Sequence, residues 1–177
     1  EVLLKMGDNV STDEIMPAGN RILPFRSNIP EISKFTFSRI DERFYDRAVQ
    51  YGQKDFFVVG GENYGQGSSR EHAVLGPRHL GLRAVIAKTF ARIHWQNLIN
   101  FGILPLTFLH TEDWLKIDQN DELVIYDIRN AVQTGREMDV HNKTKKRAIR
   151  VLHSLTDRQV EMVLAGSLIT VLRGRAA

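Results

Sequence analysis

Cysteine is missing from all 177 residues, and its absence limits the chemistry of the chain. Without thiols the chain can form no disulfide, offers no thiol nucleophile and cannot supply thiolate ligands to an iron–sulfur cluster. Its six histidines do not have the spacing that is typical of paired metal ligands. We therefore expect this chain to bind no metal and no cofactor by itself.

Long apolar runs and a strong net charge are missing as well. No run approaches the roughly 20 apolar residues that cross a bilayer, and residues 1–5 do not have the layout of a signal peptide. We expect a cytoplasmic protein with no membrane partner. The formal charge of +3 permits an anionic small substrate and does not by itself indicate nucleic acid. Because the chain begins at Glu1 and not at Met, we expect a processed chain or one end of a longer one.

The composition is that of a globular α/β domain. Apolar residues make up 42% and charged residues 25%, and the length suffices for one full core, so we expect one domain over residues 1–177. Residues 7–34, rich in Gly, Pro, Ser and Asn, predict a long irregular arm. Apolar segments then alternate with helical patterns, which predicts parallel βαβ pairing. The expected strands are 56–59, 84–87 and 103–106, and the expected helices are 41–51, 70–80 and 91–101.

The pattern changes after residue 111. Segments 122–126, 137–140 and 147–152 are short and alternate between apolar and polar residues, which predicts an antiparallel meander. Residues 155–165 predict a closing helix, with Thr156 as its N-cap and Gly166 directly after its last residue.

The stretch GGENYGQGSSREH, residues 60–72, is the most informative for function. Glycines allow a sharp bend and a close approach to a ligand. Two hydroxyls, a guanidinium and the free N–H groups of a starting helix would then converge on one spot, which suits a carboxylate or a phosphate. A Walker loop is excluded because no lysine is present, and a dinucleotide fingerprint is excluded because Arg70 occupies the place of its third glycine. From spacing alone, a strand-to-helix turn with a serine cap is the alternative.

These residues resemble the C-terminal swivelling domain of the aconitase superfamily, which includes aconitate hydratases and the small subunits of isopropylmalate and homoaconitate isomerases. The similar segments are GENYGQGSSREHA from Gly61, FARIH at 90–94, GILPLTF at 102–108, DNVSTDEIMPAG at 8–19 and AGSLI at 165–169. The resemblance implies a swivelling β/β/α fold: a partly parallel central sheet flanked by helices, and an antiparallel β meander. It also implies that residues 7–34 form an active-site arm.

The details at residues 11–13 and 64–66 look like the aconitase forms, and they imply the interconversion of citrate and isocitrate through cis-aconitate by dehydration and rehydration. By resemblance, Ser68 is the catalytic base, and Asp13 is a second catalytic residue that orients an arginine or a histidine. The residues that match substrate-binding positions are Arg26, Ser69 and Arg70.

In the family, the 4Fe–4S cluster, its cysteine ligands and the general acid belong to other domains. The resemblance therefore implies that this chain is inactive until it docks with cluster-bearing aconitase domains 1–3 or with a large subunit. One alternative is the small subunit of a 3-isopropylmalate or homoaconitate isomerase, for which Arg26 is the discriminating residue. A second is an RNA-binding regulatory module that uses the basic run HNKTKKRAIR, residues 141–150, although a solvated hairpin explains this run better because no aromatic is interleaved. A third is an inert anion-binding domain.

Overall fold

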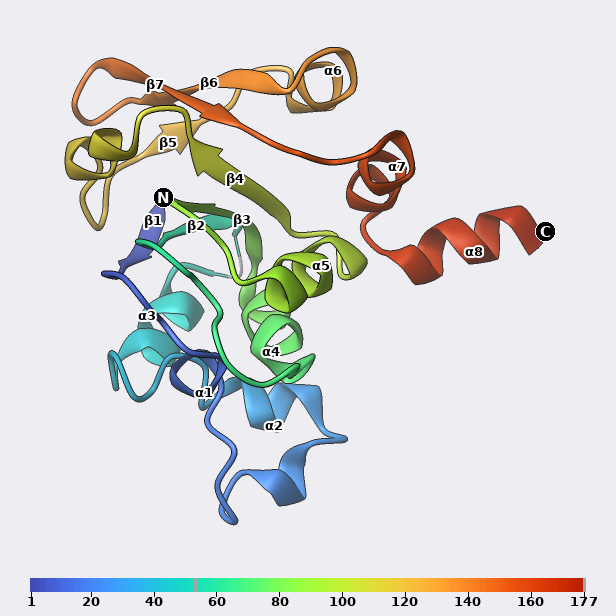
Figure 1. Cartoon of the computed structure of the whole chain (residues 1–177). Coiled ribbons are helices and arrows are strands. Elements are labelled where there is room, and N and C mark those ends of the chain that lie inside the picture. The colour runs from blue at the N-terminus through green and yellow to red at the C-terminus, as the bar shows by residue number, and fades with distance from the viewer. Residues whose placement is uncertain (53, 177) are drawn as a thin grey trace.

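The computed structural model describes residues 1–52 and 54–176; Gln53 and Ala177 of the expected domain lie outside the described residues. One seven-stranded mixed sheet forms the centre, with the strand order β1-β2-β3-β4-β7-β6-β5 (Figure 1). The strands are β1 (Val2–Lys5), β2 (Phe56–Val59), β3 (Leu82–Ala87), β4 (Leu104–Phe108), β5 (Leu123–Val124), β6 (Glu137–Asn142) and β7 (Arg147–Leu152). The expected fold class, a partly parallel sheet flanked by helices with an antiparallel meander, is confirmed.

The first four strands are parallel, as the alternation of apolar and helical segments predicts. The helices between them are α3 (Phe44–Gln50), α4 (His72–Leu80) and α5 (Arg92–Asn100). Helix α4 starts two residues later than expected, because the chain is still bending at residues 67–71. Strand β1 was not predicted, since its three apolar residues and one lysine show no alternation.

The last three strands form the predicted meander. Strands β6 and β7 pair as an antiparallel hairpin, which confirms the hairpin interpretation of residues 141–150. Strand β5 is shorter than expected, because helix α6 (Ile128–Thr134) follows soon after it; this helix and the 3-10 helix η2 (Thr111–Lys116) were not predicted. Helix α7 (Asp157–Ala165) has the predicted ends, with a capping box at Thr156 and Gly166 at φ 89°.

The prediction of an irregular arm at residues 7–34 is wrong in part. Short helices α1 (Thr12–Ile15) and α2 (Ile29–Ser33) and the 3-10 helix η1 (Leu23–Phe25) occupy much of it. Polar caps explain the two α-helices, because the side chains of Ser11 and Asn28 accept the N–H groups of Glu14 and Glu31. Helices this short show no apolar period, so the pattern of the sequence does not reveal them.

Two apolar clusters cover the two faces of the sheet. Neighbouring residues of one strand belong to different clusters: Val58 and Val85 pack towards the arm, α3 and α4, whereas Val59 and Ile86 pack towards α6 and α7. This alternation is the two-residue period of a strand that is buried on both faces. The arm and the bend at residues 60–72 therefore lie on one side of the sheet, and α6 and α7 lie on the other.

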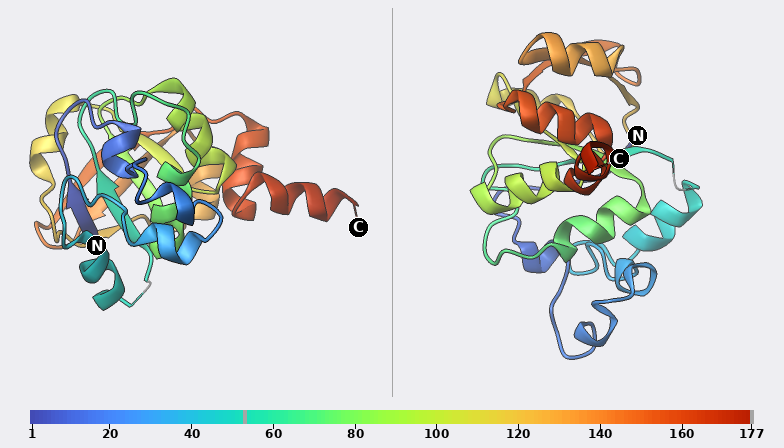
Figure 2. Two further views of the ribbon diagram at one scale, coloured as in Figure 1. Left: turned by 90° about the horizontal axis from the view of Figure 1, so that it is seen from below. Right: turned by 90° about the vertical axis from the view of Figure 1, so that its right-hand side faces the viewer.

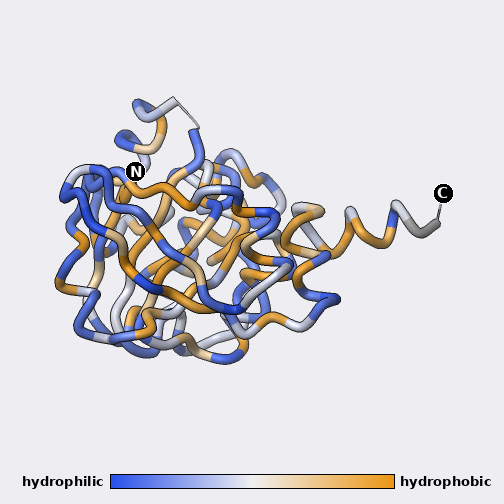
Figure 3. Tube along the Cα trace, turned by 90° about the horizontal axis from the view of Figure 1, so that it is seen from above, coloured by the Kyte–Doolittle hydropathy of each residue, from blue (hydrophilic) through white to orange (hydrophobic). Residues whose placement is uncertain are grey.

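Helix α8 (Leu168–Ala176) projects away from the body, as the left view in Figure 2 shows; the right view looks along it from its C-terminal end. The first half of this helix is apolar although it lies outside the body (Figure 3), and Ile169 is 56% exposed. No helix in the described part of the chain is long and apolar enough to cross a membrane.

Candidate functional site

The bend at residues 60–72 depends on two glycines in the left-handed region. Gly65 has a φ of 82° and Gly67 a φ of 96°, values that residues with a side chain rarely adopt. Gly65 also leaves no room for a side chain, since a Cβ built on it would lie 2.2 Å from Cδ2 of His94. The sequence prediction of a glycine-dependent bend is therefore confirmed.

The beginning of the arm is tied to this bend by backbone hydrogen bonds. The N–H of Gly65 donates to the carbonyl of Val10 at 2.7 Å, and the N–H of Thr12 donates to the carbonyl of Gln66 at 2.8 Å. The side-chain amide of Gln66 adds a bond to the carbonyl of Asn9 at 2.7 Å. These bonds align residues 9–12 with residues 65–66, and they bring the next arm residue, Asp13, to the far side of the bend.

Asp13 contacts two arginines there. Its Oδ1 lies 2.5 Å from Nη1 of Arg70, and its Oδ2 forms an ion pair with Arg39. The N–H of Ala18 also donates to Oδ1, at 3.2 Å. The structure thus brings Asp13 and Arg70 together, although they are 57 positions apart. Arg39 was missed because nothing in its local sequence distinguishes it from an exposed surface arginine.

The backbone leading into α4 offers donors to an anion. The N–H groups of Ser68, Ser69 and Glu71 have no acceptor among the residues that the structure describes. Helix α4 has Glu71 as its N-cap and no side-chain cap hydrogen bond, so neither serine serves as the cap that was the alternative explanation. Both serines are exposed. Free N–H groups at the start of a helix favour negative charge.

Beside the bend, the arm and α4 enclose a cavity of about 250 Å³. Its polar lining comes from Arg26, Arg70 and His72, and its apolar lining from Met16, Pro17, Ala18, Ile22, Leu23 and Ile32. His72 Nε2 donates to the carbonyl of Arg26 at 2.8 Å, and this contact fastens the arm to α4. The structure therefore brings Arg26 and Arg70 to one cavity, while Ser68 and Ser69 lie on the adjoining bend and do not line it.

Below the bend lies a buried histidine, His94, which is 2% exposed. Burial lowers its pKa to about 4, so the imidazole is neutral at physiological pH. Neither ring nitrogen has a hydrogen-bond partner within the described residues. Its ring packs against Tyr64, with 5.4 Å between the ring centroids, and burial raises the pKa of that phenol. His94 thus supports the bend from beneath.

The described residues contain no cluster of three or more His, Cys, Asp or Glu side chains that could hold a metal ion. The functional groups at the site are two serine hydroxyls, backbone N–H groups without an acceptor, and guanidinium groups paired with Asp13. Fold and site together define an α/β domain with an arginine-flanked, anion-attracting bend.

Comparison with known proteins identifies the family to which this domain is similar. The sequence model of the aconitase C-terminal domain matches residues 27–111. The chain is 42% identical to 3-isopropylmalate dehydratase small subunit 2 of Archaeoglobus fulgidus, over 83% of this chain and 78% of that protein. It is 34% identical to a putative mitochondrial aconitate hydratase of Aspergillus fumigatus, over 99% of this chain and 25% of that protein.

A solved structure agrees with this result. The crystal structure of 3-isopropylmalate dehydratase from Methanocaldococcus jannaschii superposes with a TM-score of 0.79 at 32% identity, covering 97% of this chain and 91% of that one. The chain belongs to the aconitase C-terminal domain family. It spans at most a quarter of the length of the matched aconitate hydratases, for example 16% of the Dictyostelium discoideum protein and 25% of the Emericella nidulans protein.

Proposed function

We propose that this chain is the substrate-binding and catalytic-base domain of an aconitate hydratase, which interconverts citrate and isocitrate through cis-aconitate. One observation carries the proposal: the arm is bonded to the glycine bend so that Arg26 and Arg70 line one cavity, with Asp13 paired to Arg70 and Ser68 on the adjoining bend. In this proposal residues 1–177 act as one domain, with residues 7–34 as its active-site arm.

In the proposed reaction, the Ser68 hydroxyl removes a proton from the carbon next to a substrate carboxylate. A serine is a weak base unless its alkoxide is stabilised, and the free N–H groups of Ser69 and Glu71 and the guanidinium of Arg70 supply that stabilisation. An iron–sulfur cluster held by the partner would supply a Lewis acid for the departing hydroxide. The elimination then forms the carbon–carbon double bond of cis-aconitate. Rehydration adds the proton and the hydroxide back with their two carbons exchanged, which gives isocitrate.

Arg70 and Arg26 bind substrate carboxylates in this proposal, and Ser69 adds a hydroxyl donor. Asp13 engages only Nη1 of Arg70; the other N–H groups of that guanidinium have no partner among the described residues. A forked contact with a carboxylate therefore stays available. By pairing with one edge of the guanidinium, Asp13 orients its other edge.

The proposal requires a larger aconitase-like partner, either cluster-bearing domains 1–3 or a large subunit, because this chain has no cysteine to ligate a cluster. The proposed compartment is the cytoplasm. Several matched relatives are named as mitochondrial proteins, and cell fractionation distinguishes the two compartments.

The decisive experiment replaces Ser68 with alanine in the assembled enzyme. We expect kcat for citrate to fall about 100-fold or more, since the base is lost, while the variant still docks with its partner. Ser154→Ala, an exposed serine that lines neither the bend nor the cavity, is the matched control and should keep the wild-type rate. Retention of the wild-type rate by Ser68→Ala would refute the assignment of the base and favour an inert anion-binding domain.

The second candidate is the small subunit of a 3-isopropylmalate or homoaconitate isomerase. Two observations favour it: six apolar residues line the cavity next to Arg26, and the chain covers about three quarters of two such subunits, 78% and 76%. Citrate presents a carboxylate where isopropylmalate presents an isopropyl group, so Arg26 should favour citrate. Rates of the reconstituted enzyme with both substrates separate the two, and a faster reaction with isopropylmalate would overturn our choice.

The RNA-binding alternative receives no support from the hairpin at residues 141–150. Lys145 forms ion pairs with Asp118 and Asp121, and Arg150 forms ion pairs with Glu137 and Asp139. These carboxylates engage two of the five Lys and Arg residues in the run and so reduce the positive charge that phosphates would meet. Filter binding over a salt series should therefore give no steep salt dependence.

A further inference from the structure

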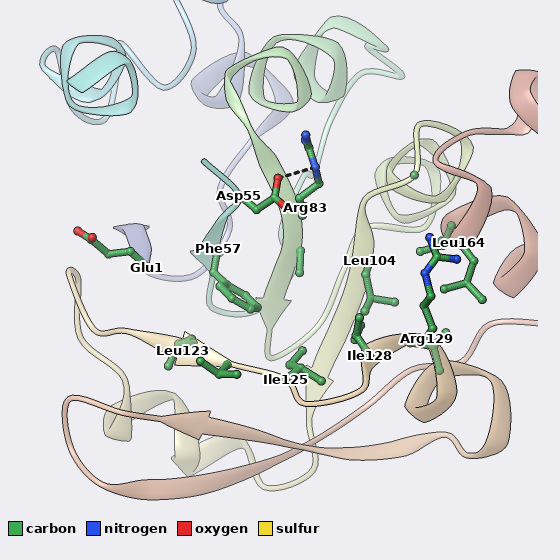
Figure 4. Close-up of a pocket in the computed structure, with 15 residues that line it drawn as sticks. Glu1, Asp55, Phe57, Arg83, Leu104, Leu123, Ile125, Ile128, Arg129 and Leu164 are labelled. Atoms are coloured by element: carbon green, nitrogen blue, oxygen red, sulfur yellow. Dashed lines mark ion pairs between the residues drawn. The ribbon is translucent and has the colours of Figure 1, made fainter. Parts of the chain in front are cut away.

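A second and larger cavity, of about 450 Å³, lies on the face of the sheet that is opposite the bend (Figure 4). Its lining comes from four strands of the sheet, β2, β3, β4 and β5, and from α6 and α7, and most of it is apolar. The apolar residues include Phe57, Leu104, Leu123, Ile125, Ile128 and Leu164. None of the residues of the proposed active site lines it. A concave apolar site of this size is typical of small-molecule sites in proteins.

The two arginines at the rim of the cavity, Arg83 and Arg129, differ in whether their side chains already have partners. Arg83 is engaged: its Nε lies 2.9 Å from Oδ1 of Asp55, and its Nη1 donates to the carbonyls of Arg78 and Leu82 at 3.3 and 3.2 Å. The side chain of Arg129, on α6, is exposed, and its guanidinium forms no ion pair or hydrogen bond with any residue that the structure describes. In Figure 4 its side chain stands beside Leu164, at the end of the cavity away from Glu1.

We propose that this cavity binds a small carboxylate with an apolar body, with its hydrocarbon on Leu104 and Ile128 and its carboxylate on Arg129. The planar guanidinium can accept a carboxylate as a forked pair without first breaking an internal ion pair. The apolar lining favours the hydrocarbon through burial and disfavours a second charge, since a second carboxylate would have to lose its water without a partner.

This site is independent of the proposed catalytic function, so binding and not turnover tests it. Octanoate is the probe, titrated calorimetrically into the intact protein below the concentration at which it self-associates. We expect saturable binding, and we expect octan-1-ol, which has the same chain length and no charge, to bind about tenfold more weakly. Nuclear magnetic resonance should show octanoate-dependent shifts at the methyl groups of Leu104 and Ile128.

Three variants sharpen the test. Arg129→Gln should weaken octanoate binding about tenfold and leave octan-1-ol binding unchanged, because it removes only the charged contact. Arg158→Gln, an exposed arginine on α7 that does not line the cavity, is the matched control and should bind as wild type does. Val163→Trp should block both ligands, because the indole fills the cavity from α7; circular dichroism checks that this variant is folded.

The proposal fails if octanoate shows no saturable binding, or if octan-1-ol binds as tightly as octanoate. It fails equally if Arg129→Gln binds octanoate with wild-type affinity, or if a folded Val163→Trp variant still binds it. Loss of citrate turnover in Ser68→Ala without any change in octanoate binding would show that the two sites are separate.

Discussion

Replacing His94 with leucine should remove much of the acid sensitivity of this fold. His94 is buried, and burial lowers its pKa from 6.5 to about 4. In the unfolded chain the imidazole binds a proton below pH 6.5, whereas in the folded protein it stays neutral until the pH is near 4. The unfolded state therefore binds more protons within this window, and the free energy of unfolding decreases as the pH falls through it.

The size of the effect follows from the pKa difference. One pKa unit corresponds to about 1.4 kcal/mol, so the shift from 6.5 to about 4 corresponds to about 3 kcal/mol of stability lost across the window. A domain of this size has a free energy of unfolding of roughly 5–15 kcal/mol. His94 alone should thus account for a substantial part of acid unfolding. Leucine has a similar volume, does not titrate and leaves no unpaired ring nitrogen, so the variant should fold at neutral pH.

The assay is urea unfolding of the wild type and His94→Leu at several pH values from 4 to 8. We expect the difference in free energy of unfolding between the two proteins to be constant near neutrality. Towards pH 4 this difference should change by about 3 kcal/mol in favour of His94→Leu. Leu98→Val, a conservative change at a buried residue of the same helix, is the control and should lower stability equally at every pH. If His94→Leu shows the same pH dependence as wild type, the buried-histidine argument is wrong.

Two further predictions concern the bend and the arm. Gly65→Ala should destabilise the fold by about 3 kcal/mol, because it places a Cβ against His94 at a positive φ; Gly19→Ala, which meets nothing within 4 Å, should cost far less in the same urea assay. Asp13→Asn should cost about 1 kcal/mol, since its arginine partners are partly exposed, but it should lower kcat/KM for citrate at least tenfold by releasing Arg70. An Asp13→Asn enzyme with unchanged kcat/KM would contradict the orienting role.

The parallel half of the sheet could be predicted from sequence because its signals are local. Apolar segments of four to six residues stand between helical patterns, and this order admits few topologies. The glycine bend was predictable for the same reason, since Gly65 and Gly67 mark backbone that other residues cannot adopt. Helix α6 could not be predicted in this way. Its N-cap residue, Asp127, has a φ of 45° and makes no side-chain cap hydrogen bond, so the sequence carries no helix-start signal there.

The composition of the candidate site was only partly predictable. Arg26, Ser68 and Arg70 came from motifs, but the contact between Asp13 and Arg70 depends on backbone bonds that join residues 9–12 to residues 65–66. A bond between segments more than fifty positions apart leaves no trace in either segment. Arg39 enters the site only through tertiary packing, and the same is true of the unpaired Arg129 across the sheet.

The two attachments of the arm have a mechanical consequence. It is bonded to the bend at Thr12 and to α4 through the carbonyl of Arg26, and the N–H of Phe37 donates to the carbonyl of Ile15 at 2.8 Å. A segment restrained at three points cannot open like a hinged flap. In the proposed assembly the arm would therefore keep its place on this domain when a partner docks. The spacing between Arg26 and Arg70 would then be the same before and after docking.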